Sequence, residues 1–416
     1  MINAKRLFLG SQVALIVTAM SFAIRGGSAA TWAIQFHLNN EELGQVLGAA
    51  LSGFTLAMLF GGPLCDLIGM RRIVAFAFVG HLVGILLTIF AWNFWSLFFG
   101  NLIFGVANGS VEAACNPLIT ALFPDDKTTK LNRFHMWFPG GIVIGAVLSY
   151  FMSKAGFSWK VEFATMLVPL VAYGFIFTGL SFPTTERVQK GISTGSMWAG
   201  CFNPLFLLMV ACMVLTATTE LGTGSWITTI LTSAGFSGIL VLAWINGVMA
   251  VGRMSAGAFV HKLSPIGMLL LSCFLSAIGL YAMSKSSGAM VYVAATIFAG
   301  GVCFFWPTML GYTNDRFPKT GALGLAIMGG AGMLGAGASA PIIGKFFDNG
   351  IAHRLTNGQT VDALSSAPDG TPLAKTWLSI QADAGLEALG KVAVLPVILF
   401  FVFLILFLTR PKAKTS

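Results

Sequence analysis

Residues 62–72, GPLCDLIGMRR, join two long apolar segments near residues 43–65 and 73–91. Each segment has about the 20 residues that an α-helix needs to cross the hydrocarbon core of a bilayer. The join carries Asp66, Arg71 and Arg72, and charges of this kind belong at the membrane surface. The stretch therefore predicts two membrane-spanning helices with a short charged connection.

Apolar segments of the same kind follow one another along the whole chain. Of its 416 residues, 56% are hydrophobic and only 9% are charged, and the mean hydropathy is +0.83. A soluble protein carries about 25% charged residues, and membrane β-barrels have short alternating segments in place of long apolar runs. We therefore expect an all-α membrane protein with twelve transmembrane helices. They lie near residues 7–36, 43–65, 73–91, 95–122, 137–154, 161–182, 203–232, 239–258, 266–284, 289–313, 321–347 and 391–409.

Polar segments divide these helices into two groups of six. We expect an N-terminal half at 1–182, a cytoplasmic linker at 183–202 and a C-terminal half at 203–416. The polar stretch 348–390 predicts a long, largely irregular extracytoplasmic loop, because it is rich in Pro, Gly and Ser.

Matching features recur between the halves at nearly constant spacing. Pro117 and Pro307 are 190 positions apart, as are Gly62 and Gly252, and a buried charge followed by Trp recurs at an offset near 195. Such spacing indicates a parallel repeat of two six-helix halves, a common transporter plan.

The distribution of charge predicts the topology. Lys and Arg concentrate in the segments that share a side with the N-terminus, so both termini are expected in the cytoplasm and the protein in the plasma (inner) membrane. The net charge of +9 is then a topology signal, and no nucleic-acid partner is expected. The six cysteines show no C-x-x-C spacing, so neither a disulfide framework nor a metal site is indicated.

Three ionisable residues lie deep in the expected helices: Arg25, Glu112 and Glu220. Such residues are costly in a bilayer and are functional hypotheses by default. Burial would favour the protonated form of Glu112, so we expect it to bind substrate hydroxyls and to carry a coupling proton. The alternative is a permanently ionised partner of Arg25 that only joins two helices.

Glu220 is followed by Gly222, Gly224 and Trp226, a carboxylate beside flexible backbone and an aromatic face. Sugars are bound by such groups, through hydrogen bonds to hydroxyls and stacking on Trp. The alternative is a structural hydrogen bond within the helix.

Arg25 has two possible roles. It either neutralises Glu112 or binds an anionic substrate, since its guanidinium suits a carboxylate or phosphate. Two buried acids against one buried base favour a neutral substrate. Further substrate-binding candidates are Trp32, Asn116, Asn246 and Trp306, although interfacial anchoring and interhelical hydrogen bonding are ordinary alternatives.

The connection at 62–72 resembles the G-x-x-x-D-x-x-G-x-R-R/K loop motif of the major facilitator superfamily, with Leu67 in place of the usual basic residue. The resemblance covers essentially the whole chain. It implies a twelve-helix fold and a gating role for Asp66, Gly69, Arg71 and Arg72, which would form a breakable latch at the cytoplasmic surface.

A narrower resemblance lies in Glu112-Ala113-Ala114-Cys115-Asn116-Pro117, in Leu131-Asn132 and in the pattern from Glu220 to Trp226. These stretches are similar to the fucose permease and glucose/galactose transporter group. In the superfamily, helices 1, 4, 7 and 10 line the central cavity, which implies that Arg25, Glu112 and Glu220 face one site. The fucose permease type has a carboxylate in helix 1 where this chain has Arg25. The resemblance therefore does not imply the complete set of proton-coupling residues of that group.

We therefore expect a monomeric secondary transporter, and not an enzyme, that moves a monosaccharide by alternating access. No P-loop segment is present, so no cofactor is expected beyond a coupling ion, H⁺ before sodium, with Glu112 and Glu220 as the coupling residues. The alternatives are a carrier of an anionic metabolite bound by Arg25, and a drug or lipid exporter. The expected partners are a small-molecule substrate and the lipid bilayer.

Overall fold

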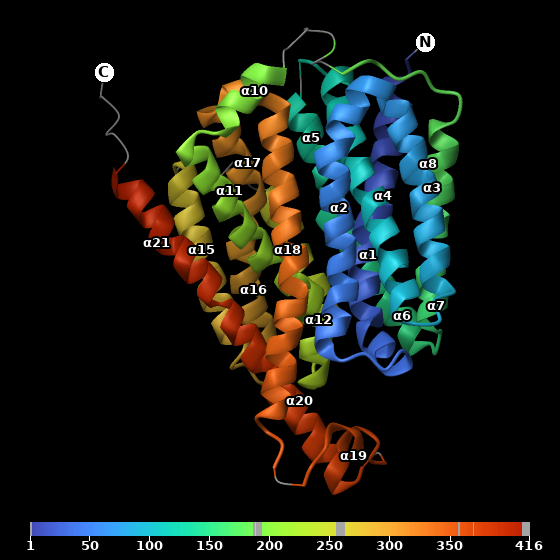
Figure 1. Ribbon diagram of the computed structural model, residues 1–416, viewed down its shortest axis with the longest axis vertical. Helices are drawn as coiled ribbons and strands as arrows, with labels where there is room; N and C mark the ends of the chain where they lie inside the picture. Colours follow the sequence, from blue (N-terminus) through green and yellow to red (C-terminus); the bar gives the residue numbers. More distant parts are fainter. Residues whose placement is uncertain are drawn as a thin grey trace.

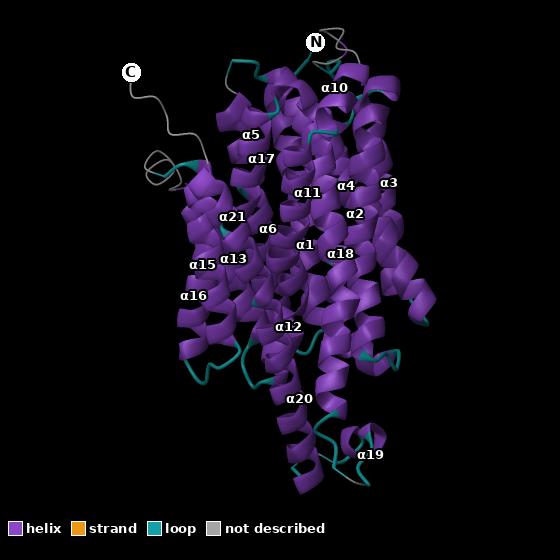
Figure 2. Ribbon diagram, turned by 60° about the vertical axis from the view of Figure 1, so that its left-hand side comes forward, coloured by secondary structure: helices purple, strands orange, loops and turns teal. Residues whose placement is uncertain are grey.

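The computed structural model describes residues 2–125, 127–185, 188, 194–254, 263–356, 358–368 and 370–409. Within these residues the chain consists of helices and loops, with no strand (Figure 2). Eleven of the described helices are long and apolar enough to cross a membrane, and α13 is a shorter apolar helix. The expected all-α membrane fold with about twelve spanning helices is confirmed.

The first six spans are formed by eight helices, because short breaks divide the sixth span and one short helix precedes the fifth. They are α1 (Ala4–Gln35), α2 (Asn40–Ile68), α3 (Met70–Ile89), α4 (Phe94–Leu122), α5 (Lys127–His135), α6 (Trp137–Lys154), α7 (Trp159–Ala164) and α8 (Leu167–Phe177).

The second six spans follow the connecting helix α10 (Thr194–Cys201). They are α11 (Pro204–Ala217) continued by the π-helix η1 (Thr218–Gly222) and α12 (Thr223–Ser233), then α13 (Gly238–Met254), α15 (Pro265–Met283), α16 (Met290–Val302) with α17 (Phe305–Arg316), α18 (Gly321–Ala352), and α20 (Pro372–Val392) with α21 (Val394–Thr409). A 3₁₀ turn, η2 (Pro318–Thr320), precedes α18, and α19 (Val361–Ser365) precedes α20. Of the expected linker 183–202, residues 186, 187 and 189–193 lie outside the described residues.

The two termini define one end of the bundle. The start of α1 and the end of α21 lie at the same end, which we call the terminal end, and α19 lies beyond the opposite end, which we call the far end (Figure 1). Because each span carries the chain to the opposite side, an even number of spans leaves both termini at the same end.

The joint between α2 and α3 depends on Gly69. Its φ of +88° lies in the region that side chains disfavour, and its N–H donates to the carbonyl of Cys65 at 3.1 Å. The chain therefore turns sharply here, and this explains why the charged connection at 62–72 is so short.

Small residues bring α2 close to helices on both sides. A Cβ atom on Gly105 of α4 would lie 2.0 Å from the carbonyl oxygen of Ala50, and one on Gly344 of α18 would lie 2.1 Å from that of Asn40. The contact between α2 and α18 joins the N-terminal and C-terminal groups of helices. Close backbone packing of this kind is the usual basis of helix association in membranes.

The far end of this contact is closed by a carboxylate. Asp348 of α18 accepts hydrogen bonds from the N–H of Asn40 (3.2 Å), the side-chain amide of Asn40 (2.9 Å) and the N–H of Glu41 (2.9 Å). The N-terminus of α2 presents free N–H groups and a positive partial charge, both of which favour an anion. Lys345 adds an ion pair with Glu41 at 3.8 Å.

The expectation of a largely irregular loop at 348–390 was wrong. α18 continues to Ala352, and α20 begins at Pro372, with Thr371 accepting a hydrogen bond from the N–H of Ala374 as its N-cap. Residues 372–392 contain four Ala and four Leu, which favour helix, and the Thr371 cap and Pro372 mark where the helix begins. The average composition of residues 348–390 therefore concealed where the helix begins.

Candidate functional site

A π-helical turn interrupts the seventh span at Glu220. The turn η1 comprises Thr218–Gly222, between α11 and α12. Turns of this type are rare and frequently occur at functional sites. The turn places the Glu220 side chain, which is 9% exposed, toward the interior of the bundle.

Glu220 is held by Arg253 through one of its two oxygens. Oε1 accepts a hydrogen bond from Nη2 of Arg253 at 3.3 Å, while Nε of Arg253 donates to the carbonyl of Cys303 at 3.1 Å. The other oxygen, Oε2, is buried and has no hydrogen-bond partner among the described residues. A buried acceptor without a partner is costly and marks a place where a ligand or water is expected.

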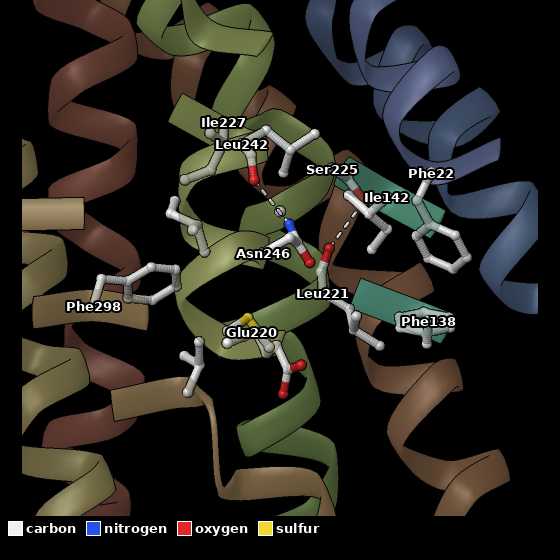
Figure 3. A pocket seen from close by; sticks show the side chains of 14 residues that line it. Phe22, Phe138, Ile142, Glu220, Leu221, Ser225, Ile227, Leu242, Asn246 and Phe298 are labelled. Atoms are coloured by element: carbon white, nitrogen blue, oxygen red, sulfur yellow. Dashed lines mark hydrogen bonds between the residues drawn. The ribbon is translucent and has the colours of Figure 1, made fainter. Parts of the chain in front are cut away.

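A small cavity adjoins Glu220 between the two groups of helices (Figure 3). Its polar lining comprises Glu220, Ser225 and Asn246, and its aromatic lining comprises Phe22 of α1, Phe138 of α6 and Phe298 of α16. The cavity volume is about 40 Å³, room for only a few waters at roughly 10–15 Å³ each. The site is therefore contracted in this conformation.

The polar groups around the cavity are mainly acceptors. The amide Nδ2 of Asn246 donates to the carbonyl of Leu242 at 2.9 Å, so its Oδ1 is left to accept (Figure 3). The hydroxyl of Ser225 donates to the carbonyl of Leu221 at 3.0 Å, which leaves its oxygen lone pairs as acceptors. Together with Oε2 of Glu220, these groups match a ligand that donates hydrogen bonds.

The pairing of Glu220 overturns the count of buried charges made from the sequence. Arg253 lies near the end of an expected helix that the distribution of charge places at the cytoplasmic surface, but its side chain is only 19% exposed and forms an ion pair with Glu220. The buried set thus contains two bases, Arg25 and Arg253, beside Glu112 and Glu220. The argument for a neutral substrate from two acids against one base therefore fails. Arg253 lies five residues inside the end of its expected helix, 239–258, and that position was the available signal.

Arg25 and Glu112 do not pair. Arg25 is buried, its Nε donates to the carbonyl of Ser21 at 3.2 Å and its Nη1 to that of Leu47 at 3.5 Å. Its guanidinium lies 5.3 Å from the centre of the Phe22 ring. Among the described residues no carboxylate lies within ion-pair distance of it.

Glu112 instead belongs to a cluster with Asn116 and His135. Its Oε2 accepts from Nδ2 of Asn116 at 2.8 Å, and its Oε1 lies 3.8 Å from Nδ1 of His135. Nε2 of His135 lies 3.0 Å from Oδ1 of Asn116. Asn116 is one helical turn after Glu112, so both side chains share one face of α4.

Two of the three expected substrate-binding tryptophans have packing contacts in the structure. Nε1 of Trp226 donates to the carbonyl of Ala340 at 2.9 Å, so the indole fixes α12 against α18. Trp32 is fully buried against Trp159 and Phe163. Helical periodicity alone could not distinguish these faces from one facing the cavity. Trp306 is partly buried and packs against an apolar cluster formed by Leu51, Phe54, Leu221, Met333 and Ala336.

The loop motif lies at the terminal end of α2 and α3. The Asp66 carboxylate accepts a hydrogen bond from the Thr185 hydroxyl at 2.5 Å, and Nη1 of Arg72 donates to the carbonyl of Ile68 at 3.4 Å. Arg71 is exposed, and Gly69 forms the turn. Thr185, which follows the sixth span, was not singled out from the sequence.

A second buried polar network was also missed. His81 accepts or donates through both ring nitrogens, at 2.9 Å to the hydroxyl of Tyr173 and at 2.9 Å to Oδ1 of Asn108, and Asn108 donates to the hydroxyl of Ser21 at 3.3 Å. The network joins α1, α3, α4 and α8. His81 is therefore a buried packing residue with both ring nitrogens hydrogen-bonded.

Comparisons with known proteins agree with this architecture. A family model described as Major Facilitator Superfamily matches residues 13–340. The D-xylose transporter of Levilactobacillus brevis is 29% identical over 156 residues, 37% of this chain and 33% of that protein. The match thus spans a third of that relative's length. The 3-(3-hydroxy-phenyl)propionate transporter of Escherichia coli (strain K12) is 24% identical over 360 residues, 82% of this chain and 88% of that protein.

Solved structures share the fold at low identity. The crystal structure of a D-xylose-proton symporter superposes with a TM-score of 0.74 at 12% identity, over 99% of both chains. An inward-facing, occupied structure of a bacterial homologue of the lysosomal transporter Spinster gives 0.76 at 14% identity, over 99% of this chain and 98% of that one.

Proposed function

The chain belongs to the Major Facilitator Superfamily, whose members compared above are transporters and not enzymes, and from that premise we propose that it carries a monosaccharide by proton-coupled symport. The observation that carries the proposal is the unpartnered Oε2 of Glu220 at the cavity between the helix groups. A sugar hydroxyl donates to such an oxygen, and the carboxylate binds it more strongly than a neutral acceptor would.

The surroundings of Glu220 support the same class of substrate. Oδ1 of Asn246 accepts a second hydroxyl, and the faces of Phe22, Phe138 and Phe298 suit the apolar face of a sugar ring. An anionic solute at this position would meet the Glu220 carboxylate. The names of several relatives, a D-xylose transporter and facilitated glucose transporters among them, support the proposal at the level of substrate class.

Alternating access would open this contracted site to each side in turn. The division into halves at 1–182 and 203–416, with the linker at 183–202, would supply the two moving bodies. The contact of α2 with α18 would act as the far-end gate, and Asp66, Gly69, Arg71 and Arg72 as the terminal-end latch. The excess of Lys and Arg supports a cytoplasmic terminal end and a plasma-membrane location.

Proton coupling would reside at Glu112, with Glu220 responding to the substrate. Energy from a gradient is sufficient, because one charge moved across about 100 mV supplies about 2.3 kcal/mol. Glu112→Gln removes the titratable proton and keeps the shape. We expect retained counterflow and lost concentrative uptake, whereas loss of folded protein would indicate a structural role.

The substrate class is tested by thermal-shift screening of the purified protein. Sugars, sugar acids and sugar phosphates are compared at two pH values, with and without sodium. We expect stabilisation by neutral sugars that responds to pH and not to sodium. Stabilisation by anions alone would contradict the proposal.

Arg25 supports a second candidate, a carrier of carboxylate or phosphate solutes. It is a buried cation without a described carboxylate partner, and two relatives carry names of organic-acid transporters. If an anion binds there, Arg25→Lys abolishes stabilisation by the anion, because the bidentate geometry is lost. If sugars are the substrates, that variant keeps their stabilisation.

A further inference from the structure

The Glu112 cluster connects the interior of the bundle to its terminal end. Glu112 is buried on α4, whereas the His135 side chain, at the end of α5, is 38% exposed. Asn116 lies between them and contacts both, at 2.8 Å and 3.0 Å. One imidazole therefore reaches both solvent and a carboxyl group inside the membrane.

The hydrogen bonds of Asn116 define which nitrogen of His135 faces Glu112. Nδ2 of Asn116 donates to Oε2 of Glu112, so its Oδ1 is the atom near His135, and Oδ1 can only accept. Nε2 of His135 must therefore carry a hydrogen. The remaining nitrogen, Nδ1, faces Oε1 of Glu112 at 3.8 Å and is free to gain or lose a proton.

We propose that His135 carries the coupling proton between Glu112 and the solvent at the terminal end, with Asn116 as the residue that orients it. The proposal rests on the proton coupling in the proposed function. The O–H bond of Glu112 breaks, its electrons stay on Oε1, and an N–H bond forms at Nδ1. The pair keeps its total charge in this step, and the imidazolium then releases the proton to solvent.

The distance indicates how the transfer is gated. Proton transfer needs about 2.6–3.2 Å between heavy atoms, or one bridging water, and the present 3.8 Å meets neither condition directly. α5 contacts α1, α4 and α6. A movement of about 1 Å in α5 would make contact, so a rearrangement at the terminal end would open and close the proton path.

Other charged groups near this end have contacts of their own. Arg6 donates to the carbonyl of Ile176 at 3.1 Å, and Lys130 lies over the Phe123 ring. Lys154, over the Tyr150 ring, is at the other end of α6. Arg133 is exposed. The titratable residues on the elements packed against His135 are Lys5, Arg6, Arg25, Glu112, Cys115, Lys127, Lys130, Arg133, Tyr150 and Lys154. Of these, Glu112 is the only carboxylic acid.

The first test needs no sugar. Infrared difference spectra between about pH 5 and pH 8, the range in which a histidine titrates, contain the C=O band of each carboxyl that loses its proton. Glu112→Gln identifies the Glu112 band by its loss. In His135→Gln we expect that band to differ from the wild-type band, because the imidazole next to Oε1 of Glu112 is gone.

The matched control is His353→Gln. His353 is an exposed histidine that follows α18 at the far end, so this variant removes an imidazole at a distance from Glu112. An unchanged Glu112 band in His135→Gln, with a normal melting temperature, overturns the relay.

The second test uses D-xylose and D-glucose in proteoliposomes. We expect His135→Gln to keep wild-type counterflow and to lose about tenfold or more in gradient-driven uptake, since removal of a general acid or base costs about 10²–10⁴ in proton transfer. Equal losses in both assays would indicate a structural role and overturn the relay. Wild-type uptake that ignores a protonophore would overturn the proposed function itself, a result distinct from an unchanged infrared band.

Discussion

The carboxylate of Glu220 and the guanidinium of Arg253 lie 3.3 Å apart, on the seventh and eighth spans, and leave one carboxylate oxygen free at the central cavity. The pair gives the cavity a carboxyl group that is held in place by Arg253 and still has one oxygen able to accept a hydrogen bond. The pair also joins η1 of the seventh span to α13 of the eighth.

Removing one member of this pair should destabilise the protein more than removing both. Arg253→Met leaves a carboxylate without its partner, and we expect a loss of about 3–5 kcal/mol. The double variant Glu220→Gln/Arg253→Met should regain much of this loss without regaining sugar binding. Melting temperatures in detergent measure the first effect and ligand-induced thermal shifts the second. Additive losses in the double variant would show that the two side chains do not interact.

The contact of Asp348 with the N-terminus of α2 should control opening of the far end. Asp348→Ala removes three hydrogen bonds, and loss of a cap of this kind costs about 1–2 kcal/mol. We expect a cysteine at position 52, where Ser52 faces Gly337 of α18, to react faster with a membrane-impermeant maleimide in this variant. The six native cysteines are buried and give the background rate. Asp348→Asn, which keeps one acceptor, should show a smaller increase, and equal rates in all three proteins would refute the gate.

Trp226 should contribute to stability and not to sugar recognition. Trp226→Phe removes the bond from Nε1 to the carbonyl of Ala340, and we expect a loss of about 1 kcal/mol in stability. Sugar-induced stabilisation should remain near the wild-type value. A large loss of sugar binding with normal stability would indicate that Trp226 contacts the substrate.

The His81 network should be a structural element of the N-terminal helices. His81→Ala leaves the Tyr173 hydroxyl and Oδ1 of Asn108 without partners, and we expect a cost of about 2–4 kcal/mol. His353→Ala is the control, because His353 is exposed. Transport by the folded fraction of His81→Ala should keep its substrate preference, and a changed preference would place His81 in the transport mechanism.

Close packing of α2 on α4 should not tolerate a methyl group. A Cβ on Gly105 would lie 2.0 Å from the carbonyl oxygen of Ala50, so Gly105→Ala should cost about 2 kcal/mol or more. Gly300→Ala in α16 is the matched control, since nothing lies within 4 Å of its added Cβ. We expect that control to be neutral or slightly stabilising, because Ala favours helix by about 1 kcal/mol. Equal melting temperatures for the two variants would contradict the packing.

The helices could be predicted from the sequence because the bilayer imposes a local rule. Each span must satisfy its own backbone hydrogen bonds and be apolar for about 20 residues, and these demands are visible in any window of the chain. The exception, α20, shows the limit of the rule. This helix extends beyond the apolar segment that crosses the membrane, so its start depends on helix propensity and on the Thr371 cap. The average composition of residues 348–390 did not reveal either signal.

What the sequence by itself determined was the class of protein, its spans and the few residues that carry charge into the membrane. Tertiary structure alone decided which charges meet. Neutralising Glu112 was one of the two roles considered for Arg25, yet Glu112 contacts Asn116 and His135, and Glu220 contacts Arg253, 33 positions away. The physical reason is range: hydropathy and helix propensity act over neighbouring residues, whereas an ion pair depends on how separate helices rotate and pack against one another.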